Sequence, residues 1–247
     1  MCYSETNWGG KSVRSSYAKR ARIHSHSVSE DWSAWIPNEM DRLFGSIRGE
    51  LESSNVIVSI SLDEALAFCE SDDFDCARDS APVFADLFDR LADRLSLVVR
   101  TTREHASHFG TLPNVSPLSA SNFRGASAQR VSMISGLLSK VVFSSRSRFF
   151  HKLSSLGDII DELQKESRAL VKYIALARPD RVEWAWRELE VLGYDLNTCM
   201  GETTVVLKSF FCALPPEELE PFRLKLVALV PALPAPDLQP RHPRGKK

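Results

Sequence analysis

Three segments of this chain carry an apolar side chain at alternating steps of four and three residues, and this spacing limits the folds open to it. The spacing keeps one side of an α-helix apolar, and an apolar side must be buried against another element. The stripes therefore predict helices that pack against one another. They run along residues 84–109, 149–174 and 196–214.

The predicted fold is all-α, an elongated antiparallel bundle of about six to seven helices. Capping residues, prolines and glycines set the expected end of each helix. The expected helices cover residues 37–53, 61–70, 81–109, 126–177, 181–192, 195–213 and 217–230.

Four features are expected to interrupt these helices. Residues 55–60 form the one clear β-like run, and because a single strand needs a partner, we expect an extended connector or a distorted helix end there. Residues 70–79 contain five acids and no periodicity, which predicts a solvated loop. A break or kink is expected at 143–147, where serines interrupt the apolar pattern, and Gly193 is expected to end the helix before it.

The chain divides into a bundle and two tails. Residues 1–29 are basic and poor in apolar side chains, which predicts a disordered tail. Residues 30–230 form the helical bundle, and the Gly-, Pro- and Ser-containing stretch 110–124 is either a hinge or a loop that crosses the bundle. Residues 231–247 form a second basic tail, which is rich in proline.

Composition sets further limits on the class of protein. At 247 residues the chain can bury a sizeable core, and no run approaches the 18 apolar residues of a membrane-spanning helix. The five cysteines are an odd number without metal-ligand spacing, which predicts an intracellular, reducing compartment, cytoplasmic or nuclear. Organellar targeting stays open, because residues 1–29 resemble a transit peptide.

The sequence lacks the common catalytic motifs. There is no phosphate-binding glycine loop, no dinucleotide fingerprint and no Gly-x-Ser-x-Gly elbow, and the histidines lack metal-ligand spacing. We therefore expect no metal and no cofactor.

Charge is distributed unevenly along the chain. Residues 63–93 carry ten acids against two basic side chains, whereas residues 124–152 carry six basic side chains and no acid. Either the two segments face each other within the fold, or the second forms a surface for an external anion. If residues 124–152 form such a surface, Arg146, Arg148 and Lys152 would bind phosphates beside Phe149 and Phe150. If they do not, the two phenylalanines belong to the core.

A short arginine–histidine pattern lies near the end of the expected helix 81–109. Arg103 is followed by His108, a spacing that resembles the ribonuclease motif of the HEPN superfamily of helical-bundle proteins. The resemblance implies that Arg103 binds the scissile phosphate and that His108 serves proton transfer. Glu104 departs from the pattern, because the family more often has an uncharged or aspartate neighbour there. His105 falls on the apolar stripe, so we expect a hydrogen-bonded core histidine.

The leading prediction is a non-catalytic helical protein that binds another protein, as an adaptor does. Trp184 and Trp186 lie two residues apart on one helix and point to different sides, so one of them, Trp184, is a candidate anchor for a partner. The alternative is an RNA-directed protein, either a binder through residues 124–152 or a HEPN-like ribonuclease that uses Arg103 and His108. A sustained apolar seam also leaves self-association open.

Overall fold

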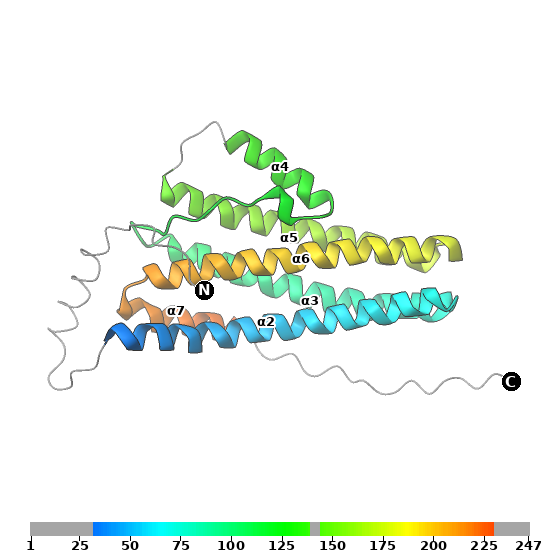
Figure 1. Ribbon diagram of the computed structural model, residues 1–247, viewed down its shortest axis with the longest axis horizontal. Coiled ribbons are helices and arrows are strands. Elements are labelled where there is room, and N and C mark those ends of the chain that lie inside the picture. Colours follow the sequence, from blue (N-terminus) through cyan, green and yellow to red (C-terminus); the bar gives the residue numbers. More distant parts are fainter. Residues whose placement is uncertain (1–31, 139–143, 230–247) are drawn as a thin grey trace.

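The computed structural model of the protein describes residues 32–138 and 144–229 (Figure 1). Both predicted tails, 1–29 and 231–247, lie outside these residues.

The described residues form six α-helices and one short 3-10 helix, without a strand, which confirms the all-α prediction. The longest helices, at 32 to 39 residues, are each about 50 to 60 Å long at about 1.5 Å per residue. The elements are α2 (Trp32–Glu70), α3 (Phe74–Ala106), η1 (Ala120–Asn122), α4 (Ala126–Leu138), α5 (Ser145–Leu176), α6 (Pro179–Ala213) and α7 (Pro216–Leu229).

The helices α2, α3, α5 and α6 form an elongated four-helix bundle in which neighbours are antiparallel (Figure 1). Near the start of α3, Arg78 Nη2 donates to the carbonyl oxygen of Ala177, just past the end of α5, at 2.8 Å. At the other end, Arg146 in α5 donates to the carbonyl oxygen of Phe109, just past α3. Contacts at both ends of the pair are possible only if the two helices run in opposite directions. The predicted antiparallel bundle is therefore confirmed.

The three apolar stripes meet in one continuous core. Phe84 and Phe88 of α3, Phe149 of α5 and Phe210 of α6 are at most 1% exposed. The ring of Phe84 meets that of Trp186 edge-on, with centroids 5.4 Å apart, a favourable arrangement for aromatic rings. The helices are thus joined by the side chains that the four-three spacing singled out.

The expected connector at residues 55–60 is wrong, because α2 runs through it without interruption. Leu51, Val58 and Leu62 are buried on one side of this helix, so the segment gains core contacts only as a helix. This packing outweighs the preference of β-branched residues for strands, which is worth less than about 1 kcal/mol each.

The predicted solvated loop at 70–79 is also wrong, since only residues 71–73 separate α2 from α3. Asp73 caps α3, its carboxylate accepting a hydrogen bond from the Cys76 amide at 3.2 Å. Asp72 has a φ of 58°, the left-handed conformation that makes this short turn. Turn chemistry at these two aspartates therefore starts α3 at Phe74 rather than at the expected residue 81.

Gly193 does not end a helix, because α6 is continuous from Pro179 to Ala213. Leu189, Leu192 and Leu196 are buried on either side of the glycine and hold the helix together.

The break expected at 143–147 is confirmed on the side that the structure describes, where Ser144 caps α5 by accepting a hydrogen bond from the Ser147 amide. Residues 139–143 lie outside the described part of the chain.

Residues 110–124 run along the outside of α5 and α6 and lead into α4, which lies over α5 (Figure 1). Leu112, Val115, Leu118 and Phe123 of this stretch are buried in the same core as the four long helices. Across the described residues, no helix combines the length and hydropathy needed to cross a membrane.

Candidate functional site

The arginine and histidine of the HEPN-like pattern are both exposed. Arg103 lies in the last turn of α3, whereas His108 lies beyond its end, in a turn closed by a 3.2 Å hydrogen bond from its amide to the carbonyl of His105. Among the described residues, neither side chain forms an ion pair or a hydrogen bond. The structure does not assemble the pair around a recess.

His105 is buried, as expected from its place on the apolar stripe, with 7% of its surface exposed. Its ring stacks on that of Phe222 in α7, with centroids 4.6 Å apart. The ring nitrogen Nε2 has no hydrogen bond, and the nearest carboxylate, Glu218, is 3.8 Å away. Burial lowers the pKa of His105, and the charge of Lys225 lowers it further.

The three basic residues predicted to bind phosphate have different surroundings. Arg146 donates to the carbonyl oxygens of Phe109 and Ser107 and so satisfies the end of α3. Lys152 is 3% exposed, and its Nζ lies 2.6 Å from a carboxylate oxygen of Glu202. Arg148 is the exposed member of the three. They therefore do not form one basic surface.

A small hollow lies beneath α4, beside Arg148, His151 and Ser155. The Ser155 hydroxyl is 3.2 Å from His151 Nδ1, a pairing that in a hydrolase would activate a nucleophile. The hollow measures about 30 Å³, which is room for one or two water molecules. A substrate cannot reach the serine in this arrangement.

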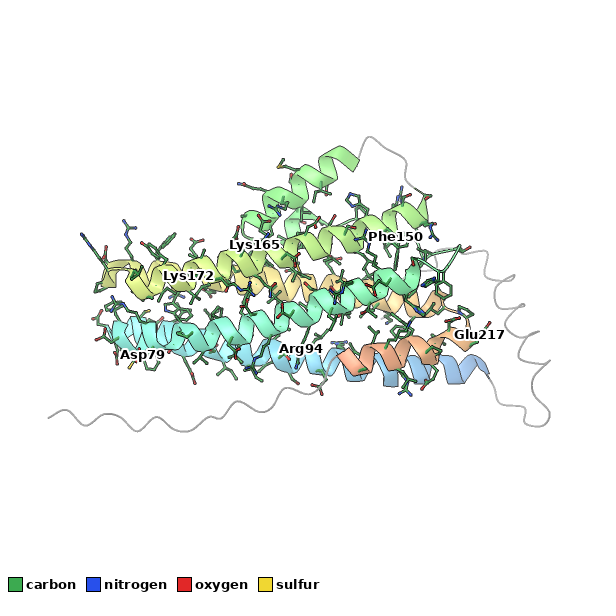
Figure 2. All side chains as sticks on the ribbon, turned by 180° about the vertical axis from the view of Figure 1, so that it is seen from behind. Asp79, Arg94, Phe150, Lys165, Lys172 and Glu217 are labelled. Atoms are coloured by element: carbon green, nitrogen blue, oxygen red, sulfur yellow. The ribbon has the colours of Figure 1, made fainter. Side chains whose placement is uncertain are left out.

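A groove of about 590 Å³ lies between α5 and α6, a size typical of ligand pockets. On α5 it extends from Glu166 to Tyr173, the stretch that begins after Lys165 and ends beside Lys172 in Figure 2. Its apolar walls are Ala169, Leu170 and Tyr173 of α5 and Trp184, Val191 and Leu192 of α6.

A buried carboxylate closes one end of the groove by fixing the start of α4. Asp195 of α6 is fully buried and accepts hydrogen bonds from the amides of Arg124 (2.6 Å) and Gly125 (3.0 Å) and from the hydroxyl of Ser127. It thus caps α4 from another helix, where its negative charge also complements the helix dipole. Gly125 allows this close approach, because a Cβ there would lie 3.0 Å from Asp195 Oδ2.

Two aromatic side chains stand at the opposite end of the groove. Trp184 is 46% exposed and Tyr173 is 41% exposed, and their rings meet edge-on with centroids 5.8 Å apart. Trp186, two residues further on, is fully buried. The prediction that the two tryptophans point to different sides of their helix is therefore confirmed, and Trp184 is the exposed one.

Two carboxylates from different helices line the same groove, Glu166 on α5 and Glu188 on α6. Burial raises the pKa of Glu166, and repulsion from Glu162 raises it further. Among the described residues, no group of three or more His, Cys, Asp or Glu side chains is arranged to hold a metal ion. The groove thus offers apolar contact and negative charge.

Comparison with known proteins does not identify this chain. No family model, curated protein or solved structure matches it. The resemblance to the HEPN superfamily therefore depends on the spacing of Arg103 and His108 alone.

Sequence reasoning found Trp184 but missed the acids around it. One signal was available for Asp195, which follows Leu192 by three residues and precedes Cys199 by four, so that an acid falls within an apolar stripe. Glu166 and Glu188 carry no such signal, because an acid on the polar side of a helix is ordinary. Their shared groove depends on how α5 and α6 pack.

Proposed function

We propose that this chain is a non-catalytic helical adaptor that binds another protein by docking a segment of it in the α5–α6 groove. The observation that carries the proposal is Trp184, nearly half exposed beside Tyr173 at the edge of a groove of about 590 Å³. Tryptophan and tyrosine are among the residues that dominate the binding energy of protein interfaces.

The surroundings of the other candidate residues support this choice. His105 is sealed under α7, and Ser155 faces a hollow of about 30 Å³. Arg146 and Lys152 are engaged with carbonyl and carboxylate groups within the fold, which leaves little of the basic stretch for the phosphates of an RNA.

Selection from a library of random peptides displayed on phage tests the proposal even though the partner is unidentified. The full-length protein is expected to enrich peptides with apolar anchors, and the same selection on Trp184→Ala is expected to enrich none of them. Val205→Ala is the matched control, because Val205 is 55% exposed on the same helix and does not line the groove. Peptides that bind Trp184→Ala as well as they bind the wild type would disprove docking at this groove.

A further inference from the structure

We propose that the α5–α6 groove recognises a polypeptide segment in which a lysine or arginine lies beside apolar side chains, with Glu166 and Glu188 receiving the cation. This inference rests on the docking function proposed above and names the kind of partner that the groove accepts.

The walls of the groove require apolar contact from the occupant. Leu170 and Tyr173 line one wall, and Trp184 and Val191 line the other. Aromatic side chains of this kind contribute binding energy through the large area that they bury. A purely polar segment would leave these walls without that gain.

The two carboxylates in the groove are available to a partner. Among the described residues, neither Glu166 nor Glu188 forms an ion pair or a hydrogen bond. Neighbouring acids of α6 are occupied differently, since both Glu183 and Glu190 lie within 4 Å of Arg187, at 3.8 and 3.4 Å. Of the acids of α6 near the groove, Glu188 is thus the one whose described surroundings leave it open to an external cation.

The balance of charge in the groove favours a basic occupant. Two carboxylates line it against one guanidinium, that of Arg181. Arg181 lies 3.8 Å from the carboxylate of Asp180, its neighbour in the chain, and its side chain is 61% exposed. A cation placed between the walls would also offset the repulsion that Glu166 experiences from Glu162.

The length of the groove sets the size of the segment. From Glu166 to Tyr173 the α5 wall rises about 10 Å, at about 1.5 Å per residue. About two turns of a helix cover that distance, so an amphipathic helix can place apolar side chains toward Trp184 and a basic one toward Glu166.

Binding of the selected peptides to full-length variants tests this inference. Glu166→Gln and Glu188→Gln are each expected to weaken binding about tenfold, as loss of a charge-assisted hydrogen bond does. Glu190→Gln is the matched control, because Glu190 lies on α6 and does not line the groove, and it is expected to leave affinity unchanged. Arg181→Gln is expected to leave affinity unchanged or to strengthen it. Wild-type affinity is expected to fall as salt rises, because the proposed contacts are ionic.

The outcomes separate this inference from the function on which it rests. Selected peptides without a basic residue, or peptides that bind both glutamine variants as tightly as the wild type, would overturn the inference; if Trp184→Ala still abolished their binding, docking itself would stand. Binding unaffected by Trp184→Ala would overturn both. Dimers that form with rising protein concentration, that Trp184→Ala abolishes and that Glu188→Gln leaves intact would show a second copy in the groove, and would also overturn the inference.

Discussion

Gly125 is the position where a single atom should affect the groove most. A Cβ there would lie 3.0 Å from Asp195 Oδ2 and 3.2 Å from Val191 Cγ1, closer than normal contact. Asp195 is held in place by its hydrogen bonds to the start of α4. Gly125→Ala is therefore expected to destabilise the protein by about 1–3 kcal/mol, as overpacking does, in urea unfolding experiments.

A second glycine provides the control for that experiment. Gly157 lies within α5, and a Cβ there would meet nothing within 4 Å. Gly157→Ala is expected to stabilise the protein by up to about 1 kcal/mol, through helix propensity alone. Equal effects of the two substitutions would contradict the close packing around Gly125.

Asp195 is expected to be the most sensitive polar residue of the α4 junction. Asp195→Asn places an amide group where a backbone amide of residue 124 or 125 now donates, so at least one part-buried donor loses its acceptor beside a fully buried side chain. The expected loss is about 2–3 kcal/mol, larger than for Ser127→Ala, because a buried unsatisfied group and a charged acceptor are both involved. Urea unfolding of both variants measures this, and equal losses would contradict the capping role.

At the residue scale, the sequence predicted which side chains are exposed better than it predicted which residues pair with each other. The two-residue spacing of Trp184 and Trp186 predicted that they would point to different sides, and they do. The pairing of Lys152 with Glu202 was not predictable, because residues 50 positions apart become neighbours only through the crossing of α5 and α6.

The contact between α7 and His105 predicts a pH dependence. Lys225 and Glu218 of α7 and His108 face this histidine, and burial lowers its pKa below the usual value of about 6.5. The folded state therefore binds fewer protons than the unfolded state, and stability falls as pH decreases below about 6.5. The effect should be absent in His105→Phe, which keeps the stacking on Phe222.

The measurement is the difference in unfolding free energy between wild type and His105→Phe, followed downward from about pH 7.5. The unfolding free energy of His105→Phe relative to that of the wild type is expected to increase as pH falls. His108→Gln is the comparison variant, because the charge of His108 is the smallest of the causes that lower the pKa of His105, and it should keep most of the wild-type pH dependence. Identical pH profiles for wild type and His105→Phe would contradict the prediction.

At the element scale the sequence predicted helices better than their ends. Stripes of buried residues located α3, α5 and α6 because packing and periodicity agree there. The connector at 55–60 and the stop at Gly193 were wrong because local propensities of about 1 kcal/mol or less were weighed without the core contacts of whole helices. The groove itself was not predictable, since it depends on the distance between two helices.

At the scale of the whole molecule, the described part of α4 buries fewer apolar side chains than any of the four long helices. Polar groups make many of its contacts with the bundle, including the ion pair of Arg130 with Glu162 and the hydrogen bonds to Asp195. Val131 is the buried apolar side chain among its described residues. Native-state hydrogen exchange should therefore show α4 amides opening at a lower free energy than those of α3. Equal protection of the two helices would contradict this.

Taken as a whole, the molecule is a rod built on four long helices (Figure 1). The proposed function depends on the recess between α5 and α6. Two tryptophans on α6 distinguish binding in this recess from other changes in the protein, since Trp184 borders the groove and Trp186 is buried in the core. They differ in exposure although they are neighbours in sequence.

The most direct test follows the indole N–H resonances of Trp184 and Trp186 in NMR spectra while a selected basic, apolar peptide is added to the full-length protein. The Trp184 resonance, assigned with Trp184→Phe, is expected to shift in proportion to binding, and the Trp186 resonance to stay nearly unchanged. Binding that leaves the Trp184 resonance in place would contradict the claim that the α5–α6 groove is the docking site.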